Sequence, residues 1–296
     1  MRFFVSRLFF PFAILVTMAS FLYARATGAS LELAVILPSA AVLLLAMLFE
    51  RLLPFRAEWN RPRGDARTDL ASAGVLFAVV DPALKWLLPF ALATLYGGAD
   101  ITPGPALFPT SLPFAVQLMV AALLAEFGGY WAHRLHHTHR ALWWLHALHH
   151  GSERLYALNN FRIHPLNYAI TYACGMLPLL LIGTPADVLY GYLALTYPVL
   201  MLQHANLPLR SGVLNYVFST NEVHRWHHSS APGEGDSNFG RALVIWDIVF
   251  RTFRYRPGAN MPEAVGLYRG GAYPAKENFW RQVASMLRPG CCRARA

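Results

Sequence analysis

Cysteine is scarce in this chain, and several common cofactor motifs are missing. Only three of its 296 residues are cysteines: Cys174 inside an apolar stretch, and the pair Cys291-Cys292 near the end. Their spacing gives no CxxC motif and no disulfide framework. No His-Glu dipeptide occurs, which excludes the helical zinc-protease motif, and no glycine-rich flavin or nicotinamide fingerprint is present.

Charge is also scarce, at 14% of residues, whereas 55% are hydrophobic. This composition is that of an integral membrane protein. The 25 lysines and arginines outnumber the 16 acidic residues and give a net charge of +9. Many of the arginines flank apolar stretches instead of forming a soluble basic face. We therefore interpret them as positive-inside flanks and expect no nucleic-acid partner.

Apolar stretches follow one another along the first two thirds of the chain. They predict an all-α fold, a polytopic membrane helical bundle with about five or six spans. The first stretch resembles a signal peptide in part, but a retained helix is favoured because a second apolar run follows soon after it. The stretches are residues 8–23, 33–49, 70–96, 113–132, 166–182 and 187–203.

Arginine placement predicts the orientation of this bundle. Residues 51–67 contain five arginines, whereas residues 97–112 contain no lysine or arginine. Cytosolic loops are the ones enriched in these residues. The first of these loops is therefore expected in the cytosol and the second outside. Span 113–132 would then return to the cytosol, where the histidine-rich part of the chain begins.

Residues 70–96 contain charges that are unusual for a span. Asp81-Pro82 and Lys85 interrupt the apolar sequence. Proline kinks a helix, so one kinked span and a re-entrant hairpin are both possible; the loop charges favour a crossing. A charge at bilayer depth needs a partner or a water-lined cavity.

One histidine pattern, H-x-x-H-H, occurs three times. Positions i, i+3 and i+4 of an α-helix lie on one face, so each copy can direct its imidazoles toward one point. Imidazole suits iron, zinc, copper and nickel. The copies begin at His133, His146 and His224.

Clustered histidines are better explained by metal than by packing. Without metal, so many imidazoles would repel one another when protonated and lack partners when neutral. A catalytic zinc takes three protein ligands and a structural one four. The three copies supply up to nine histidines, which fits two metals better than one. Soluble di-iron bundles use Glu-x-x-His ligands, and that pattern is missing.

The ordered histidine motifs resemble the fatty acid hydroxylase/sterol desaturase superfamily. The resemblance covers about residues 115–255 and rests on His133-x-x-x-His137, His146-x-x-His149-His150 and His224-x-x-His227-His228. The flanking residues match as well: Glu126, Tyr130-Trp131, Leu142-Trp143, Arg162-x-His164-Pro165-Leu166, His204-Ala205-Asn206, Asn238-Phe239-Gly240 and Trp246-Asp247. Two positions depart from the family pattern. Gly151 stands where a serine commonly follows the second motif, and Arg251 stands where glycine often precedes Thr-Phe.

The resemblance implies a membrane oxidoreductase with two non-haem iron ions that uses O2 to hydroxylate or desaturate a lipid, such as a sterol, fatty acyl chain or ether lipid. His136 and His164 have uncertain roles in it, and His139 lies outside the motifs. The implied metal ligands are His133, His137, His146, His149, His150, His224, His227 and His228, with His204 as a further ligand.

Glu126 and Asn206 are the candidate catalytic residues outside the metal ligands, because either could hydrogen-bond to a metal-ligating histidine and orient it. The missing cofactor fingerprints imply a separate electron-donor protein, and the apolar helices let a lipid substrate enter from the bilayer. A membrane metal transporter or a haem-binding electron carrier is the alternative. We expect three parts: N-terminal membrane helices in 1–112, the catalytic domain in 113–256, and a basic C-terminal tail in 257–296.

Overall fold

The computed structural model describes residues 1–87, 107–258, 261–267 and 273–288, and its regular structure there is helical, with only two isolated β-bridges. This confirms the all-α fold. The long helices are α1 (Phe9–Thr27, preceded by a π-helical turn, Phe4–Leu8), α2 (Leu31–Leu52), α3 (Ala66–Val75, continued by the π-helical turn Leu76–Val80), α5 (Phe114–Thr138), α7 (Pro165–Leu181) and α8 (Ala186–Gln203). The short ones are α6 (Arg140–His150), α9 (Asn221–His227), α10 (Ile245–Val249) and α11 (Phe279–Ala284), with 3-10 turns Ala57–Asn60, Ala157–Phe161, Gly212–Tyr216 and Ser285–Leu287.

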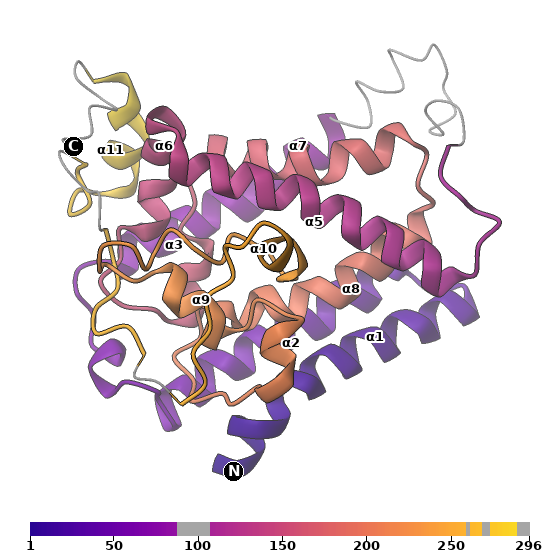
Figure 1. Ribbon diagram of the computed structural model, residues 1–296, viewed down its shortest axis with the longest axis horizontal. Coiled ribbons are helices and arrows are strands. Elements are labelled where there is room, and N and C mark those ends of the chain that lie inside the picture. Colours follow the sequence, from indigo (N-terminus) through magenta and orange to yellow (C-terminus); the bar gives the residue numbers. More distant parts are fainter. Residues whose placement is uncertain (88–106, 259–260, 268–272, 289–296) are drawn as a thin grey trace.

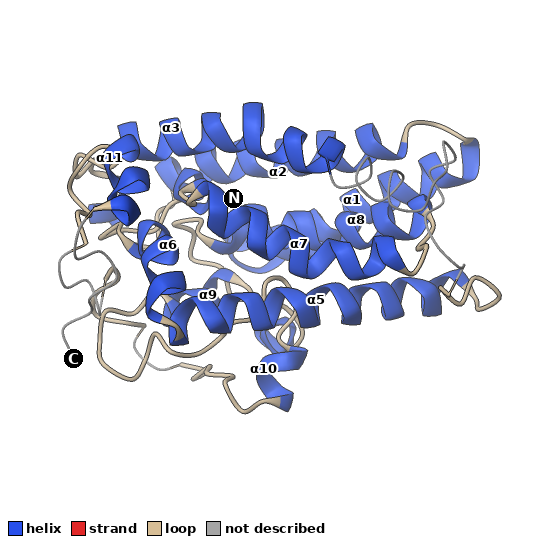
Figure 2. Ribbon diagram, turned by 90° about the horizontal axis from the view of Figure 1, so that it is seen from above, coloured by secondary structure: helices blue, strands red, loops and turns tan. Residues whose placement is uncertain are grey.

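The long helices run side by side along the longest axis, and α6, α9 and α11 gather at one end as a cap (Figure 1). Helix α8 packs against α1, α2 and α5, and α5 packs against α7. Seen from above, α5 and α2 lie on opposite sides, with α7 and α8 between them (Figure 2). One hydrophobic cluster joins Phe9 and Val42 to Leu202 and Ala242. Residues on both sides of position 112, the expected boundary of the catalytic domain, therefore pack in one cluster. The division into domains stays a prediction.

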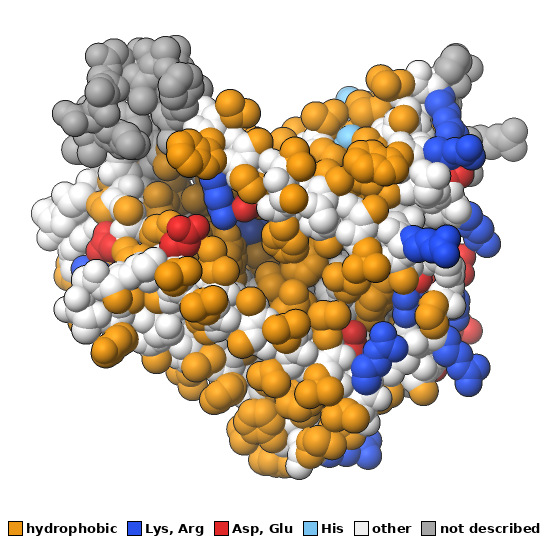
Figure 3. Space-filling view, turned by 180° about the vertical axis from the view of Figure 1, so that it is seen from behind, with side chains coloured by type: hydrophobic (Ala, Val, Ile, Leu, Met, Phe, Trp, Pro, Cys, Tyr) orange, Lys and Arg blue, Asp and Glu red, His pale blue; other side chains and the backbone are white. Residues whose placement is uncertain are grey.

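The described residues contain four helices that are long and apolar enough to cross a bilayer: Phe4–Thr27, Leu31–Leu52, Ala66–Leu87 and Phe114–Thr138. This is fewer than the five or six spans expected. Helix α7 is apolar but has only 17 residues, a length of about 26 Å at 1.5 Å per residue, which is shorter than the roughly 30 Å hydrocarbon core of a bilayer. Hydrophobic side chains cover most of the face in Figure 3, and its lysines and arginines are concentrated toward the capped end.

The charges in span Ala66–Leu87 have the partners that the sequence requires. The Lys85 ammonium lies 2.7 Å from a carboxylate oxygen of Asp81, and the Tyr168 hydroxyl donates to the other oxygen at 2.7 Å. The π-helical turn directly before Asp81-Pro82 is where the helix adjusts to the missing proline N–H. The remainder of the expected span, residues 88–96, lies outside the described residues.

One departure from the family pattern has a backbone explanation. Arg251 follows α10 with φ +58°, in the left-handed region that costs an L-residue about 1–2 kcal/mol. Glycine adopts this conformation without that cost. We expect Arg251→Gly to raise the free energy of unfolding by about 1 kcal/mol, part of the gain being offset by the entropy of the unfolded chain.

Thermal unfolding in detergent measures this effect. Arg256→Gly is the matched control, because Arg256 is also an exposed arginine near this loop and its φ is not positive. The control should leave stability unchanged or lower it. An equal gain from both variants would contradict the strain at Arg251.

Candidate metal centre

Nine buried or half-buried histidines form two groups at the capped end of the bundle. Within each group the ligand atoms lie within 4.8 Å of one another. Helix α5 contributes two histidines, α6 three, the residue after α8 one, and α9 with the residue after it three. The five-histidine group contains His133, His137, His146, His150 and His227, and the four-histidine group contains His149, His204, His224 and His228.

The sequence predicts that the histidines of each motif copy converge on one point. The structure shows that they do not. In the second copy His146 and His150 join the five-histidine group, whereas His149 joins the other. The third copy divides in the same way: His224 and His228 join the four-histidine group, and His227 joins the five-histidine group. Adjacent residues of a helix are separated by about 100° around its axis. The i+3 and i+4 rings therefore diverge, and in both copies the i and i+4 rings share one group while the i+3 ring joins the other.

Acceptors behind the rings fix the tautomers of several histidines. The Nδ1 atoms of His133 and His227 lie 2.8 Å from the carbonyl oxygens of Phe239 and Ser237. The Nδ1 atoms of His146 and His204 lie 2.9 and 2.8 Å from side-chain oxygens of asparagines, Asn167 and Asn159 respectively. These oxygens only accept hydrogen bonds, so each Nδ1 carries the proton. Each Nε2 is left with a lone pair directed into the groups.

Facing ring nitrogens make the groups suitable for cations. The Nε2 atoms of His133 and His146 are 3.0 Å apart, although neither carries a proton to donate. Such a pair is repulsive unless a cation lies between the two nitrogens. Two ligands about 2.1 Å from a metal and at about 90° to each other are separated by about 3.0 Å. The Nε2 atoms of His204 and His224, at 3.0 Å, and of His224 and His228, at 3.1 Å, have the same spacing.

Burial keeps these rings neutral. It lowers the pKa of His149 to about 4, and burial together with the neighbouring imidazoles holds the pKa values of His146, His204 and His228 well below the usual 6.5. Neutral imidazole is the form that binds metal. At pH 7 these residues therefore have lone pairs available for transition-metal ions, and the donor set fits iron.

His136, the middle histidine of the first copy, belongs to neither group. Its Nδ1 donates to the carbonyl oxygen of Ala132 at 2.6 Å, and its Nε2 accepts from the Asn167 amide nitrogen at 3.1 Å. The Asn167 oxygen in turn accepts from His146. His136 therefore orients Asn167, and through it a candidate ligand.

The remaining histidines have structural or solvent-exposed positions. His164 caps α7, because its Nδ1 accepts from the backbone N–H of Leu166 at 3.1 Å. His139 is exposed at the junction of α5 and α6. Neither residue belongs to a histidine group.

Glu126 and Asn206, the two candidate catalytic residues, have their described contacts outside the histidine groups. The Glu126 carboxylate accepts from the Tyr192 hydroxyl at 2.8 Å and from the backbone N–H groups of Ala242 and Leu243 at 2.9 Å each. The Asn206 side chain accepts from the backbone N–H of Arg56 at 2.9 Å and donates to its carbonyl oxygen, also at 2.9 Å. These contacts support positioning roles, and a catalytic role for either residue stays a prediction.

Some positioning residues were not singled out in the sequence. Asn159 and Asn167 hold His204 and His146, and nothing in their local sequence distinguishes them from other asparagines. Asp247 had a signal, because it belongs to the Trp246-Asp247 element of the family resemblance. Its carboxylate accepts from the backbone N–H groups of Phe239 and Gly240 at 2.7 Å each and so fixes the loop that holds His133.

The hydrogen-bond relay from His136 through Asn167 to His146 predicts a partial loss of function when it is broken. Asn167→Leu removes the acceptor of His146 Nδ1 and leaves His136 without its amide donor. Loss of such a partner lowers metal affinity or activity roughly 10- to 100-fold. We expect a loss of this size in turnover, with metal still bound when it is supplied in excess.

His164→Ala is the matched control, because it removes a buried histidine from the same helix start without touching the relay. Metal titration followed by turnover measurement distinguishes the two variants. Equal loss from both would assign the effect of Asn167→Leu to the packing of α7.

The fold and the site together define a class: an integral membrane helical protein whose capped end has two buried groups of histidines that could hold metal ions. Comparison with known proteins shows what the chain is similar to. Residues 118–252 match the family model described as fatty acid hydroxylase, close to the range expected from the motifs. The match covers just under half of the chain and is consistent with the resemblance to the fatty acid hydroxylase/sterol desaturase superfamily.

Several curated relatives are similar to the chain. Ornithine lipid hydroxylase OlsE of Rhizobium tropici is 36% identical over 215 residues, which are 71% of this chain and 64% of the relative. Alkylglycerol monooxygenase is 31% identical in Danio rerio, over 45% of this chain and 30% of the relative, and 31% in Homo sapiens, over 45% and 29%. The chain thus spans less than two thirds of the length of these relatives. No solved structure matches it.

Proposed function

We propose that this protein is a membrane-bound di-iron oxygenase that hydroxylates a lipid. The observation that carries the proposal is the pair of histidine groups in which ring Nε2 atoms face one another about 3.0 Å apart. Two iron ions bound there would supply the redox chemistry that activates O2. The names of the relatives, a lipid hydroxylase and a monooxygenase, favour hydroxylation over desaturation.

The proposed reaction converts R–H, O2, two electrons and two protons into R–OH and H2O. One oxygen atom enters the lipid and the other leaves as water. The electrons come from a separate donor protein. The substrate is a lipid that enters from the bilayer, because the histidine groups lie at the end of a bundle whose outer surface is apolar.

The chain's own residues hold and shield the centre. Nine imidazoles supply neutral nitrogen ligands, and Asn159, Asn167 and the carbonyl oxygens of Phe239 and Ser237 fix four of their tautomers. Trp143 and Phe239 are buried beside the five-histidine group and exclude water. A dry site protects the protein and the substrate from side reactions.

Two alternative functions, a metal transporter and a haem-binding electron carrier, fit the structure less well. A membrane metal transporter would place ligands at the bilayer midplane and commonly add carboxylates, whereas the histidine groups lie where α5 and α8 end. A haem-binding electron carrier would use single histidines on separate spans. Two dense groups of neutral imidazoles favour a bound metal pair over both alternatives.

Product analysis under labelled oxygen tests the proposal. The protein is expressed in cells, their lipids are compared with those of cells carrying an inactive variant, and the new species is analysed after growth under ¹⁸O2. We expect one ¹⁸O atom in the new hydroxyl and two iron ions per purified chain. A haem absorption spectrum, or a desaturated product without incorporated oxygen, would contradict the proposal.

We also propose that the centre lies on the cytosolic side of the membrane, as the five arginines of residues 51–67 suggest. In a cysteine-free background, we expect Thr110→Cys to react with an impermeant thiol reagent in intact cells. Ala231→Cys should react only after permeabilisation. Both residues are exposed, so access to each depends on its side of the membrane. The opposite labelling pattern would place the centre outside.

A further inference from the structure

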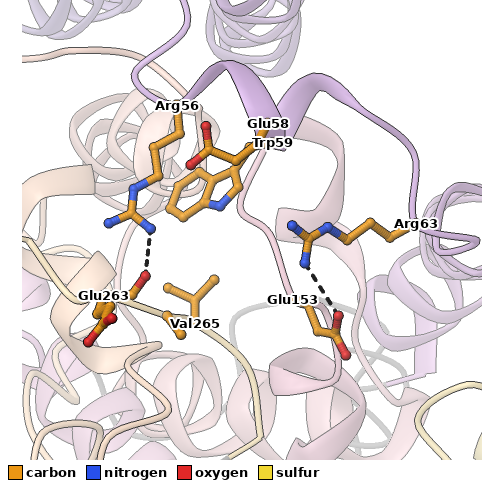
Figure 4. Close-up of a pocket in the computed structure, with 8 residues that line it drawn as sticks. Arg56, Glu58, Trp59, Arg63, Glu153, Glu263 and Val265 are labelled. Carbon is orange, nitrogen blue, oxygen red and sulfur yellow. Dashed lines mark hydrogen bonds and ion pairs between the residues drawn. The ribbon is translucent and has the colours of Figure 1, made fainter.

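The cap has a pocket of about 250 Å³ whose arginines are already engaged. Figure 4 shows the Arg56 guanidinium bonded to the carbonyl oxygen of Glu263, at 2.8 Å, and Arg63 paired with Glu153, at 3.4 Å. Both partners belong to the lining of the pocket itself. A ligand has more donors available to it in another part of the molecule.

A second polar region lies inside the helical bundle. Figure 3 shows a hollow in the apolar surface, with cationic and anionic side chains inside it. Six described side chains form a cluster of this character between the long helices, which we call the polar cluster. Its members are Asp81 and Lys85 of the span Ala66–Leu87, Tyr168 and Tyr172 of α7, Tyr197 of α8, and Arg241 of the loop after α9. None of these six side chains is fully buried, so the polar cluster borders open space.

One half of the polar cluster is built on an ion pair. The Lys85 ammonium lies 2.7 Å from one oxygen of Asp81, and the Tyr168 hydroxyl donates to the other oxygen at 2.7 Å. The ring of Tyr172 stacks on that of Tyr168 with 6.2 Å between centroids, and Tyr197 lies within electrostatic reach of the ion pair. Each oxygen of the carboxylate therefore has a donor, whereas the ammonium has three N–H donors and needs only one for the pair.

The other half of the polar cluster is Arg241. Its side chain passes beside Gly129 of α5 and donates to the Tyr192 hydroxyl at 3.3 Å. That hydroxyl donates in turn to the Glu126 carboxylate at 2.8 Å. Arg241 is only half-buried in spite of this central position, and its charge also acts on Tyr197. A guanidinium has five N–H donors, and the contact with Tyr192 uses one.

Donors outnumber acceptors in the polar cluster, whereas its charges balance. Among the described residues, the hydroxyls of Tyr172 and Tyr197 have no hydrogen-bond partner, and Lys85 and Arg241 have N–H groups beyond those used above. Each of the two cations has a carboxylate nearby, so neutrality needs no further anion. A neutral group with a strong acceptor oxygen is therefore the best complement to these donors.

Two helices carry both the polar cluster and the histidine groups. Tyr197 lies seven residues before His204 along α8, a separation of about 10 Å at 1.5 Å per residue. On α7, Tyr168 directly follows Asn167, whose side-chain oxygen accepts from His146. A lipid with its polar group in the cluster therefore has part of its chain close to the candidate metal centre.

We propose that the polar cluster binds the carbonyl group of an acyl lipid, in ester or amide linkage, and so selects acyl lipids over ether lipids and sterols. The inference rests on the proposed function, which makes a membrane lipid the substrate. A carbonyl oxygen accepts two hydrogen bonds and needs none in return, which matches the tyrosine, lysine and arginine donors. An ether oxygen is a weaker acceptor, and a sterol hydroxyl also has a proton to donate.

Matched lipids test this selectivity without catalysis. The probes are monohexadecanoylglycerol, its amide counterpart and the corresponding hexadecyl ether, which share the chain and the two free hydroxyls. Native mass spectrometry of the iron-loaded protein in detergent measures their relative affinities in equal mixtures. We expect an ester or amide lipid to bind roughly tenfold more tightly than the ether, a difference of about 1.4 kcal/mol, as one or two hydrogen bonds provide. The better bound of the two carbonyl lipids identifies the linkage.

The double variant Tyr172→Phe/Tyr197→Phe should bring the ratio between carbonyl and ether lipids to about one and leave the iron content unchanged. Each single variant should give an intermediate ratio, which keeps the test decisive if the double variant loses iron. Tyr23→Phe is the matched control, because this tyrosine is exposed on α1 away from the polar cluster; it should keep the full preference.

Equal binding of ester, amide and ether by the unmodified protein would overturn the carbonyl site. So would an unchanged preference in the tyrosine variants, the same loss in the Tyr23→Phe control, or tighter binding of cholesterol than of the carbonyl lipids. An intact carbonyl preference without any ¹⁸O-labelled product in cells would instead contradict the proposed function.

Discussion

His149→Ala should abolish hydroxylation and lower bound iron from two ions per chain to about one, since the loss of a ligand removes part of the binding free energy. His149 is one of only four histidines in its group. Its ring lies 4.8 Å from those of both His204 and His228, so no other group of the same chemistry fills its place. The remaining three imidazoles would hold the metal weakly, and the pair that must share O2 would be incomplete.

Iron analysis and turnover on the same purified sample check this result. His139→Ala is the control, because this histidine is exposed and belongs to neither group; the variant should keep two iron ions and most of its activity. Near-full activity together with two iron ions in His149→Ala would show that the division into two metal sites is wrong.

The five-histidine group should respond differently to the same substitution. His227→Ala leaves four histidines in that group, and the Nε2 of His150 loses a neighbour 3.1 Å away. We expect activity to disappear here too, but with more iron retained than in His149→Ala. The difference follows from the number of ligands that remain.

The sequence was sufficient to predict that the motif histidines gather in one region, but not how they divide between two groups. The spacing of His146, His149 and His150 places them on one side of a helix, and this spacing predicts that they share one metal ion. The division becomes visible only when α5, α8 and α9 bring other histidines from opposite directions. Long-range packing of this kind has no local sequence signal.

The spans show a similar limit. Their positions followed from apolar runs, and the partner that Lys85 requires was expected from the cost of a charge in the bilayer. That this partner is Asp81, held by Tyr168 from a helix far along the chain, required the fold. The number of spans was overestimated because an apolar run of 17 residues, such as 166–182, was counted as a span, whereas helix α7 of that same length is shorter than the bilayer core.

The two candidate catalytic residues illustrate why roles are harder to predict than positions. Glu126 stands seven residues before His133, and a carboxylate there can either touch the reacting centre or support the scaffold. Its partners, Tyr192 and the backbone of residues 242–243, favour the second role. The loop that it holds continues to Phe239, the acceptor behind His133.

Two substitutions at Glu126 separate these roles. Glu126→Ala leaves two buried backbone N–H groups and a tyrosine hydroxyl unsatisfied, at about 1–3 kcal/mol each. The sum, about 3–9 kcal/mol, is comparable to a native stability of about 5–15 kcal/mol, so we expect a large loss of folded protein. Glu126→Gln keeps an oxygen for the two N–H groups, and its amide can donate to the Tyr192 oxygen.

We therefore expect Glu126→Gln to fold with reduced stability, since the nearby Arg241 loses a compensating charge. It should bind two iron ions and keep at least about a tenth of the turnover, because losing one hydrogen bond or charge contact costs about 1 kcal/mol and a tenfold loss in rate requires about 1.4 kcal/mol. Tyr192→Phe, which removes only one partner of Glu126, is the matched control and should retain both iron and activity. A proton-transfer role makes the opposite prediction: Glu126→Gln would fold, bind both iron ions and be inactive, because a glutamine cannot exchange a proton at working pH.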